Sequence, residues 1–145
     1  MDAWRTAVVE EAKRWLRTPW MHRSRIRGVG VDCAQLLIGV FSGAGVIEAF
    51  DTGEYPVDWM LHRDEELYLA WVRPYAREIT REQVQPGDLA MWKFGRTYSH
   101  SAIVIDPPTI IHAVQRCQAV VLGNMDHDAD LIGRPVLYFS LFGEA

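Results

Sequence analysis

Residues 28–37, GVGVDCAQLL, join a glycine-containing segment to an apolar run and place Cys33 at the junction. Asp32 is a favoured helix N-cap, and Gln35 follows it at the spacing of a capping box. This pattern predicts a helix from Asp32 to Phe41. Two interpretations of Cys33 compete: it is either a small apolar residue in the first turn of a core helix or a nucleophile.

The start of a helix does not by itself make Cys33 a competent nucleophile. Unpaired backbone N–H groups and the helix dipole favour a thiolate, and the same N–H groups can bind an oxyanion. The dipole contributes ~0.3–1 kcal/mol and at most ~2 kcal/mol, whereas one pKa unit corresponds to about 1.4 kcal/mol. The thiol pKa therefore falls by roughly one unit from about 8.5. Catalysis at neutral pH also requires a histidine beside the sulfur and a group that orients it.

The chain contains five histidines, and two of them interrupt β-type runs. His100 lies in SHSAIVI and His112 in IIHAVQ, where a buried imidazole needs a polar partner. Two histidines on neighbouring strands can satisfy each other. The remaining three lie in a loop, a charged helical segment and an acidic loop, which favours solvated surface positions: His22, His62 and His127.

The register of the expected hairpin decides whether the two strand histidines can meet. Side chains alternate between the faces of a strand, so an odd-length loop, or a bulge with the same effect, is needed to place both on one face. We predict such a register, with His100 and His112 on the face that carries Ala102 and Val104. A two-residue hairpin centred on Pro107-Pro108 would place the rings on opposite faces.

Helix-favouring segments precede strand-favouring segments along the chain. The first expected helix covers 2–17, and its apolar face contains Trp4, Val8, Ala12 and Trp15. The second ends in SGAG, where Gly43 and Gly45 can supply left-handed caps. The other expected elements are a loop over 20–31, an irregular segment over 46–58, helix formers over 59–73 before Pro74, and strands in QPGDLAMW, SHSAIVID, TIIHAV, QAVVLGN and RPVLYFSLF. This order predicts an α+β fold with helices packed on a central antiparallel sheet.

The 145 residues are 49% hydrophobic and 23% charged with a net charge of −4, which predicts one globular domain over 1–145. No basic field suggests nucleic-acid binding. No apolar run approaches the ~20 residues of a membrane helix, and the acidic N-terminal segment predicts no Sec-type export. The two cysteines, Cys33 and Cys117, are expected to be reduced thiols, and Cys117 receives no role.

Four motifs occur in an order that resembles the NlpC-type cysteine peptidases of bacterial cell walls: TPW…GVGVDCAQLL, QPGDLAMW, SHSAIVI and IIHA. The resemblance covers about residues 3–115. It implies a papain-like α+β fold, with the nucleophile at the start of a helix that packs on a sheet carrying the histidines. By position, Cys33 matches the nucleophile, His100 the general base, and His112 the polar residue that orients His100. Asp32 matches the acidic residue before the nucleophile, which we expect to be structural.

The sequence departs from the family pattern at two places. Trp20 stands where the family usually has a tyrosine whose hydroxyl assists near the nucleophile, and an indole N–H can only donate. Ala34-Gln35 follows the cysteine in place of Ser-Gly. Either change can narrow the cleft or weaken the enzyme.

The resemblance also implies a reaction and a setting. The family cleaves the bond between γ-D-glutamate and diaminopimelate or lysine in peptidoglycan stems, through a thioester and without a cofactor. The long insert between the cysteine and PGDL looks most like the branch of phage tails, prophages and gene transfer agents. We therefore expect synthesis in the bacterial cytoplasm, assembly with tail hub or tip proteins, and action on the wall of the target cell.

Three arginines precede the nucleophile and are candidates for binding substrate carboxylates: Arg23, Arg25 and Arg27. A solvated basic loop explains them equally well. One cysteine and two histidines can also bind zinc with a fourth ligand, but no close-spaced ligand pair is present. DHDAD lacks the glycine and the final glutamate of a calcium loop, so we interpret it as an acidic turn and expect no metal. A non-enzymatic tail-assembly module and an acyltransferase remain alternatives to a hydrolase.

Overall fold

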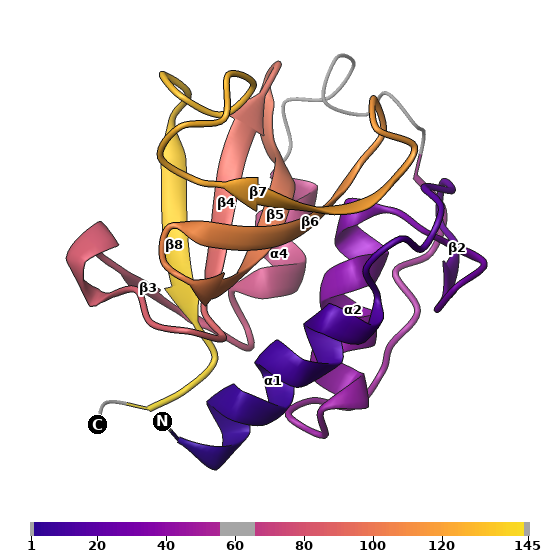
Figure 1. The fold of residues 1–145 in the computed structure, drawn as a ribbon, viewed down its shortest axis with the longest axis horizontal. Helices are drawn as coiled ribbons and strands as arrows, with labels where there is room; N and C mark the ends of the chain where they lie inside the picture. The colour runs from indigo at the N-terminus through magenta and orange to yellow at the C-terminus, as the bar shows by residue number, and fades with distance from the viewer. Residues whose placement is uncertain (1, 56–65, 144–145) are drawn as a thin grey trace.

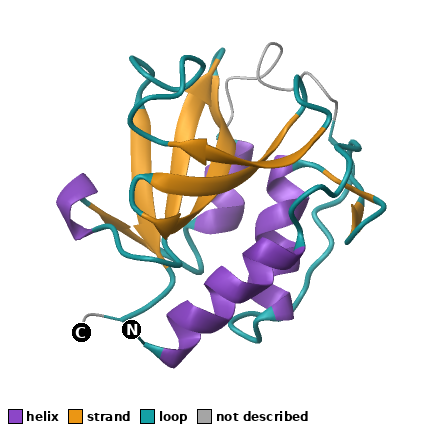
Figure 2. Ribbon diagram, in the orientation of Figure 1, coloured by secondary structure: helices purple, strands orange, loops and turns teal. Residues whose placement is uncertain are grey.

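The chain folds into helices packed against a six-stranded antiparallel sheet (Figure 1, Figure 2). The computed structural model describes residues 2–55 and 66–143. Its elements are α1 (Ala3–Arg14), β1 (Arg25–Ile26), β2 (Gly30–Val31), α2 (Cys33–Gly43), α4 (Leu67–Val72), β3 (Arg77–Ile79), a 3₁₀ turn (Arg81–Gln83), β4 (Leu89–Phe94), β5 (Thr97–Asp106), β6 (Thr109–Val114), β7 (Ala119–Asn124) and β8 (Val136–Ser140). The strand order is β3-β8-β4-β5-β6-β7. The predicted α+β architecture is confirmed.

Most predicted elements form, with their ends shifted by a few residues. The structure also contains elements that were not predicted: β3, the 3₁₀ turn and the β1–β2 hairpin. The hairpin lies inside the segment predicted as a loop. Such short strands show no alternating pattern from which to predict them. Of the helix formers over 59–73, residues 67–72 form α4, and 56–65 lie outside the described residues. No helix within 2–55 and 66–143 is long and apolar enough to cross a membrane.

Helix α1 buries a different face at its first turn from the one predicted. Val8 and Ala12 are fully buried as expected, but Trp4 is 54% exposed. Arg5 takes the inward position and is only 6% exposed, because its guanidinium pairs with the buried Asp88. The placement of Trp4 in the apolar face was therefore wrong.

Helix α2 begins directly after the predicted N-cap and ends two residues later than predicted. The Asp32 Oδ1 accepts a hydrogen bond from the Gln35 N–H at 2.9 Å. Gly43 is still helical, and only Gly45 has a left-handed conformation, with φ of +81°. A β-carbon on Gly43 would lie 2.8 Å from the carboxyl carbon of Glu11. The absence of a side chain on Gly43 therefore leaves room for the Glu11 carboxyl between α1 and α2.

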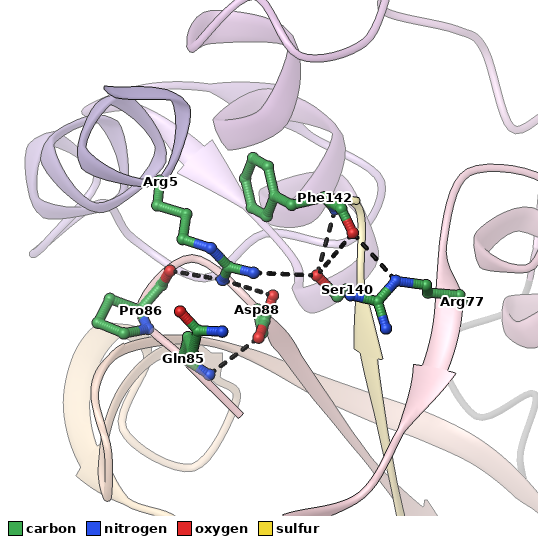
Figure 3. A network of polar contacts seen from close by, with 7 residues as sticks. All are labelled: Arg5, Arg77, Gln85, Pro86, Asp88, Ser140 and Phe142. Atoms are coloured by element: carbon green, nitrogen blue, oxygen red, sulfur yellow. Dashed lines mark hydrogen bonds and ion pairs between the residues drawn. The ribbon is translucent and has the colours of Figure 1, made fainter. Parts of the chain in front are cut away.

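Arg5 and Asp88 form a buried ion pair that ties α1 to the turn before β4 (Figure 3). Arg5 Nη1 lies 2.9 Å from Asp88 Oδ1 and also donates to the Pro86 carbonyl at 3.0 Å. Asp88 Oδ2 accepts from the Gln85 N–H at 2.9 Å. Arg5 Nη2 lies 3.4 Å from Ser140 Oγ on β8. Arg5 therefore links α1 to both the PGDL turn and β8.

The sheet is covered by apolar residues on both faces. The face toward the helices contributes Leu89, Met91, Ile103, Ile111 and Phe139 to the larger cluster. The opposite face contributes Ala90, Trp92, Ala102, Val104 and Ile110 to a second cluster, which Met125 and Leu131 cover from the segment after β7. Alternation along each strand separates the two sets.

The β5–β6 hairpin combines a two-residue loop, Pro107-Pro108, with a bulge beside it. The paired residues are Ile103 with Ile111, Val104 with Ile110, and Asp106 with Thr109. Ile105 is the additional residue, and it changes which side chains share a face.

This bulge places His100 and His112 on the face that also carries Ala102 and Val104, as predicted. A two-residue loop alone would have separated the rings, and the bulge has the effect of the odd loop. The register puts His112 across from Ala102, so the two histidines are diagonal neighbours rather than directly opposed.

Candidate active site

A pocket of about 350 Å³ opens at the N-terminus of α2, against β5 and β6. The residues predicted as catalytic all line it: Cys33, His100 and His112. Trp20 and Asp32, predicted as supporting residues, line it as well. The fold therefore brings together side chains that are far apart in the sequence.

The thiol of Cys33 points from the first turn of α2 toward β5. Its Sγ donates a hydrogen bond to the carbonyl of Ser99 at 3.2 Å. Ser99 is an unpaired bulge residue of β5, and bulges of this kind redirect side chains next to active sites. The bulge thus brings the backbone beside His100 into contact with α2.

The protein environment keeps the resting Cys33 thiol neutral. Burial raises the pKa of this thiol well above its usual range, and the neighbouring Asp32 carboxylate raises it further. The backbone N–H groups of Ser101, Ala34 and Cys33 act in the opposite direction. The helix N-terminus favours the thiolate as expected, but desolvation is the larger effect, so the thiol needs a base to react.

His100 and His112 form a hydrogen-bonded pair. The Nε2 of His100 lies 2.8 Å from the Nδ1 of His112, and the ring centroids are 5.1 Å apart. Burial lowers the pKa of His100 to about 3, with His112 and Arg134 lowering it further. Burial also lowers the pKa of His112 to about 4. Both rings are neutral near pH 7, so one nitrogen of the pair donates and the other accepts, and His100 Nδ1 is the nitrogen outside the pair.

Two aromatic rings and Arg134 lie near His100. The ring centroids of Trp92 and Phe94 lie 5.9 and 5.3 Å from the His100 centroid. The guanidinium of Arg134 lies 3.7 Å from the Phe94 centroid. Arg134 and Arg116 both line the pocket, although the sequence analysis did not select them. Both lie in turns beside strands, where no periodic pattern marks a side chain as facing a site.

A polar network joins the start of α2 to the segment that follows it. Asp32 Oδ2 accepts from the Tyr55 hydroxyl at 2.6 Å. Gln35 Nε2 donates to the Tyr55 oxygen and to Thr52 Oγ1, both at 3.1 Å. The predicted capping box is therefore only half formed, because the Gln35 side chain reaches residues 52–55 instead of the Asp32 N–H. Gln35, which departs from the family pattern, therefore fixes residues 52–55 against α2. The sequence analysis did not select Tyr55, because its segment shows no periodic pattern.

The other three histidines have different surroundings. His22 lines the pocket, with its Nδ1 3.9 Å from Asp32 Oδ2 and its ring edge-on to Tyr55. It is partly buried there rather than fully solvated as predicted. His127 is exposed, as expected. His62 lies outside the described residues.

The arginines predicted to bind substrate are not brought into the pocket. Within the described ranges, Arg23 lies 3.5 Å from Glu54, and Arg27 lies 3.5 Å from Glu11. Arg25 donates to the carbonyl of Phe50 at 3.0 Å. The side chains of Arg23 and Arg27 are 37% and 51% exposed, so the loop is partly solvated, as in the alternative interpretation, and is also held by neighbouring residues.

The acidic side chains of DHDAD do not converge on one point. Asp126 pairs with Arg81 at 2.8 Å, and Asp130 pairs with Arg116 at 2.5 Å. Asp128 accepts from a backbone N–H of its own turn. Among the described residues, no three His, Cys, Asp or Glu side chains are arranged to hold a metal ion.

Comparison with known families identifies the domain. A sequence model described as the NlpC/P60 family matches residues 17–129, which include Cys33, His100 and His112. The chain belongs to the NlpC/P60 family. No curated protein matches it at the significance required.

Solved structures support the same NlpC/P60 fold. The domain is similar to the NlpC/p60 domain of the peptidoglycan hydrolase SagA, with 21% identity, a TM-score of 0.62, and coverage of 92% of this chain and 96% of that one. The peptidoglycan hydrolase RipB of Mycobacterium tuberculosis is 17% identical with a TM-score of 0.65, over 97% and 66% of the two chains. RipD of the same organism, described as a non-catalytic domain adapted to peptidoglycan binding, is 13% identical with a TM-score of 0.63, over 98% and 100%.

Proposed function

We propose that this NlpC/P60 domain is a cysteine endopeptidase that hydrolyses peptidoglycan stem peptides. The observation that carries the proposal is a single pocket in which Cys33, at a helix N-terminus, shares the lining with the hydrogen-bonded pair of His100 and His112. The description of SagA and RipB as peptidoglycan hydrolases supports the substrate class. The expected target is the bond between γ-D-glutamate and diaminopimelate.

The first step forms a thioester. His100 accepts the thiol proton on Nδ1 while Cys33 Sγ bonds to the substrate carbonyl carbon, and the carbonyl electron pair moves to oxygen. Backbone N–H groups at the start of α2, including that of Cys33, stabilise this oxyanion. Collapse of the intermediate breaks the C–N bond, and His100 returns the proton to the leaving amine.

The second step releases the acyl group. A water molecule attacks the thioester carbonyl carbon while His100 removes a proton from that water. The C–S bond then breaks, the sulfur recovers its proton from His100, and the stem peptide leaves with a new carboxyl group. His112 accepts from His100 Nε2–H throughout, so the base keeps its Nδ1 free for the reacting groups.

Digestion of purified sacculi with the unmodified protein tests the activity and the bond. We expect new amino termini to appear, and mass spectrometry to identify diaminopimelate as the residue that carries them. Release at another bond would contradict the proposed specificity. An acyltransferase would instead give products in which the new acyl end is joined to an acceptor amine.

A non-catalytic wall-binding module is the second candidate, because RipD combines this fold with the description of a non-catalytic domain. Trp20 in place of the usual tyrosine also favours it, since the indole cannot accept a hydrogen bond. Sedimentation of the protein with intact sacculi, without release of any amino group, would support this candidate over the hydrolase.

The proposed setting is a phage-like tail that opens the wall of a target cell. Support comes from the resemblance of the long insert between Cys33 and the PGDL turn to the tail-associated branch of the family. We expect proteomic mass spectrometry to detect the chain in purified tail particles together with hub or tip proteins. Recovery of the chain only outside the particles would contradict this setting.

A further inference from the structure

The outer nitrogen of His112 faces a carboxylate that the proposed reaction does not yet use. On β7, a β-carbon added to Gly123 would lie 2.7 Å from His112 Nε2 and 2.6 Å from Asp128 Oδ2. The ring nitrogen and the carboxylate oxygen therefore face the same small space, which exists because residue 123 has no side chain. His112 and Asp128 also line one cavity on this side of the sheet.

The turn after β7 holds Asp128 in this position. Its Oδ2 accepts from the Asn124 N–H at 3.0 Å, and its own N–H donates to the Asn124 carbonyl at 3.0 Å. An asparagine at 128 retains both hydrogen bonds, since its amide oxygen can accept in the same place. The charge of Asp128 can thus be removed without removing the contacts that shape the turn.

Asp128 is not the only titratable group near His112, but the nearby Asp130 is paired with an arginine. The titratable or charged residues that line its two cavities are His22, Asp32, Cys33, Tyr55, His100, Arg116, Cys117, Asp128, Asp130 and Arg134. Asp130 forms an ion pair with Arg116. Among the described residues, no lysine or arginine forms an ion pair with Asp128, so no paired cation offsets its negative charge on this side of the ring.

The proposed reaction requires one particular tautomer of each histidine in the pair, and Asp128 can stabilise the tautomer that His112 needs. If His100 is to accept a proton on Nδ1, its Nε2 must carry hydrogen and donate to His112 Nδ1. His112 must then carry its own hydrogen on Nε2, which is the nitrogen that faces Asp128. The Asp128 carboxylate on this side of the ring stabilises that tautomer by its negative charge and through a bridging water molecule.

We propose that Asp128 is a positioning residue that selects the tautomer of His112 and, through it, the basic nitrogen of His100. This inference rests on the proposed function for its consequence, but the tautomer itself is a property of the resting protein. The electrostatics agree with the geometry: burial lowers the pKa of His112, and Asp128 is the largest influence that raises it, followed by Asp130.

Histidine-selective ¹⁵N NMR of the full chain tests the proposal with Asp128→Asn. We expect the unmodified protein to show His112 with hydrogen on Nε2. The variant should show a lower pKa for His112, since a nearby negative charge is lost, and a larger share of the other tautomer. Asp126→Asn is the matched control, because Asp126 lies in the same turn and pairs with Arg81 instead.

Kinetics supply the second measurement. We expect Asp128→Asn to lower kcat/KM by about tenfold or more and to move the acid limb of its pH profile downward, while Asp126→Asn changes neither. An unchanged tautomer and pKa of His112 in Asp128→Asn would overturn the proposal. The NMR result stands even if the unmodified protein has no hydrolytic activity, so failure of the proposed function and failure of this inference are distinguishable.

Discussion

Cys33→Ala is expected to reduce the release of amino termini from peptidoglycan to the level of buffer alone. The variant removes the only atom of the pocket that can form the thioester, and no other described group there takes its place. His100→Ala is expected to lower kcat/KM by about 10²–10⁴-fold, because the neutral thiol then has no base. Both effects are measured as initial rates of amino-group release from the same preparation of sacculi.

The controls separate nucleophilic chemistry from general damage. Cys117→Ala removes the other free thiol, which is exposed, and should leave the rate unchanged. The double variant Cys33→Ala/His100→Ala should be no slower than Cys33→Ala, since residues that act as a unit are not additive. Full activity in Cys33→Ala would exclude the thioester mechanism.

Asp88→Ala is expected to lower the free energy of unfolding by about 3–5 kcal/mol. The substitution leaves the Arg5 guanidinium buried without its carboxylate, and it deprives the Gln85 N–H of its acceptor. Because native domains are stable by only about 5–15 kcal/mol, this loss is a large share of the total. Urea denaturation followed by circular dichroism measures it as a lower midpoint at constant slope.

Two further variants show whether burial of the pair is the cause. Asp126→Ala breaks the partly exposed pair with Arg81 and should cost about 1 kcal/mol or less. Arg5→Met/Asp88→Ala removes both charges and should cost less than the sum of the single changes. Equal losses in the free energy of unfolding at the buried and the exposed pair would show that burial of the Arg5–Asp88 pair is not the cause of the destabilisation.

The register of the β5–β6 hairpin could be predicted in part from the sequence alone. The parity of strand positions predicts that His100 and His112 share a face, and the structure confirms this. The bulge at Ile105 that achieves it was one of two predicted solutions, and no residue pattern distinguishes a bulge from an odd loop. Motif order likewise predicts that Cys33 meets the two histidines, and all three line one pocket.

Contacts between distant segments could not be predicted in the same way. The helical pattern of α1 selects Trp4 for the core, whereas tertiary pairing with Asp88 turns Arg5 inward. Tyr55 and Asp128 lie in irregular segments, where periodicity carries no information about orientation. The sequence favoured the arginines before Cys33 as substrate contacts because they lie close to it along the chain. The arginines that line the pocket are instead Arg116 and Arg134, which only the folded chain brings there.

The link from Gln35 to Thr52 and Tyr55 sets a rule for building chimeras of this domain. One glutamine side chain in the first turn of α2 holds a segment that lies about 20 residues further along the chain. A donor segment grafted in place of residues 44–55 would arrive without its own partner on that helix. Residue 35 and the graft must therefore be exchanged together, as a single cassette.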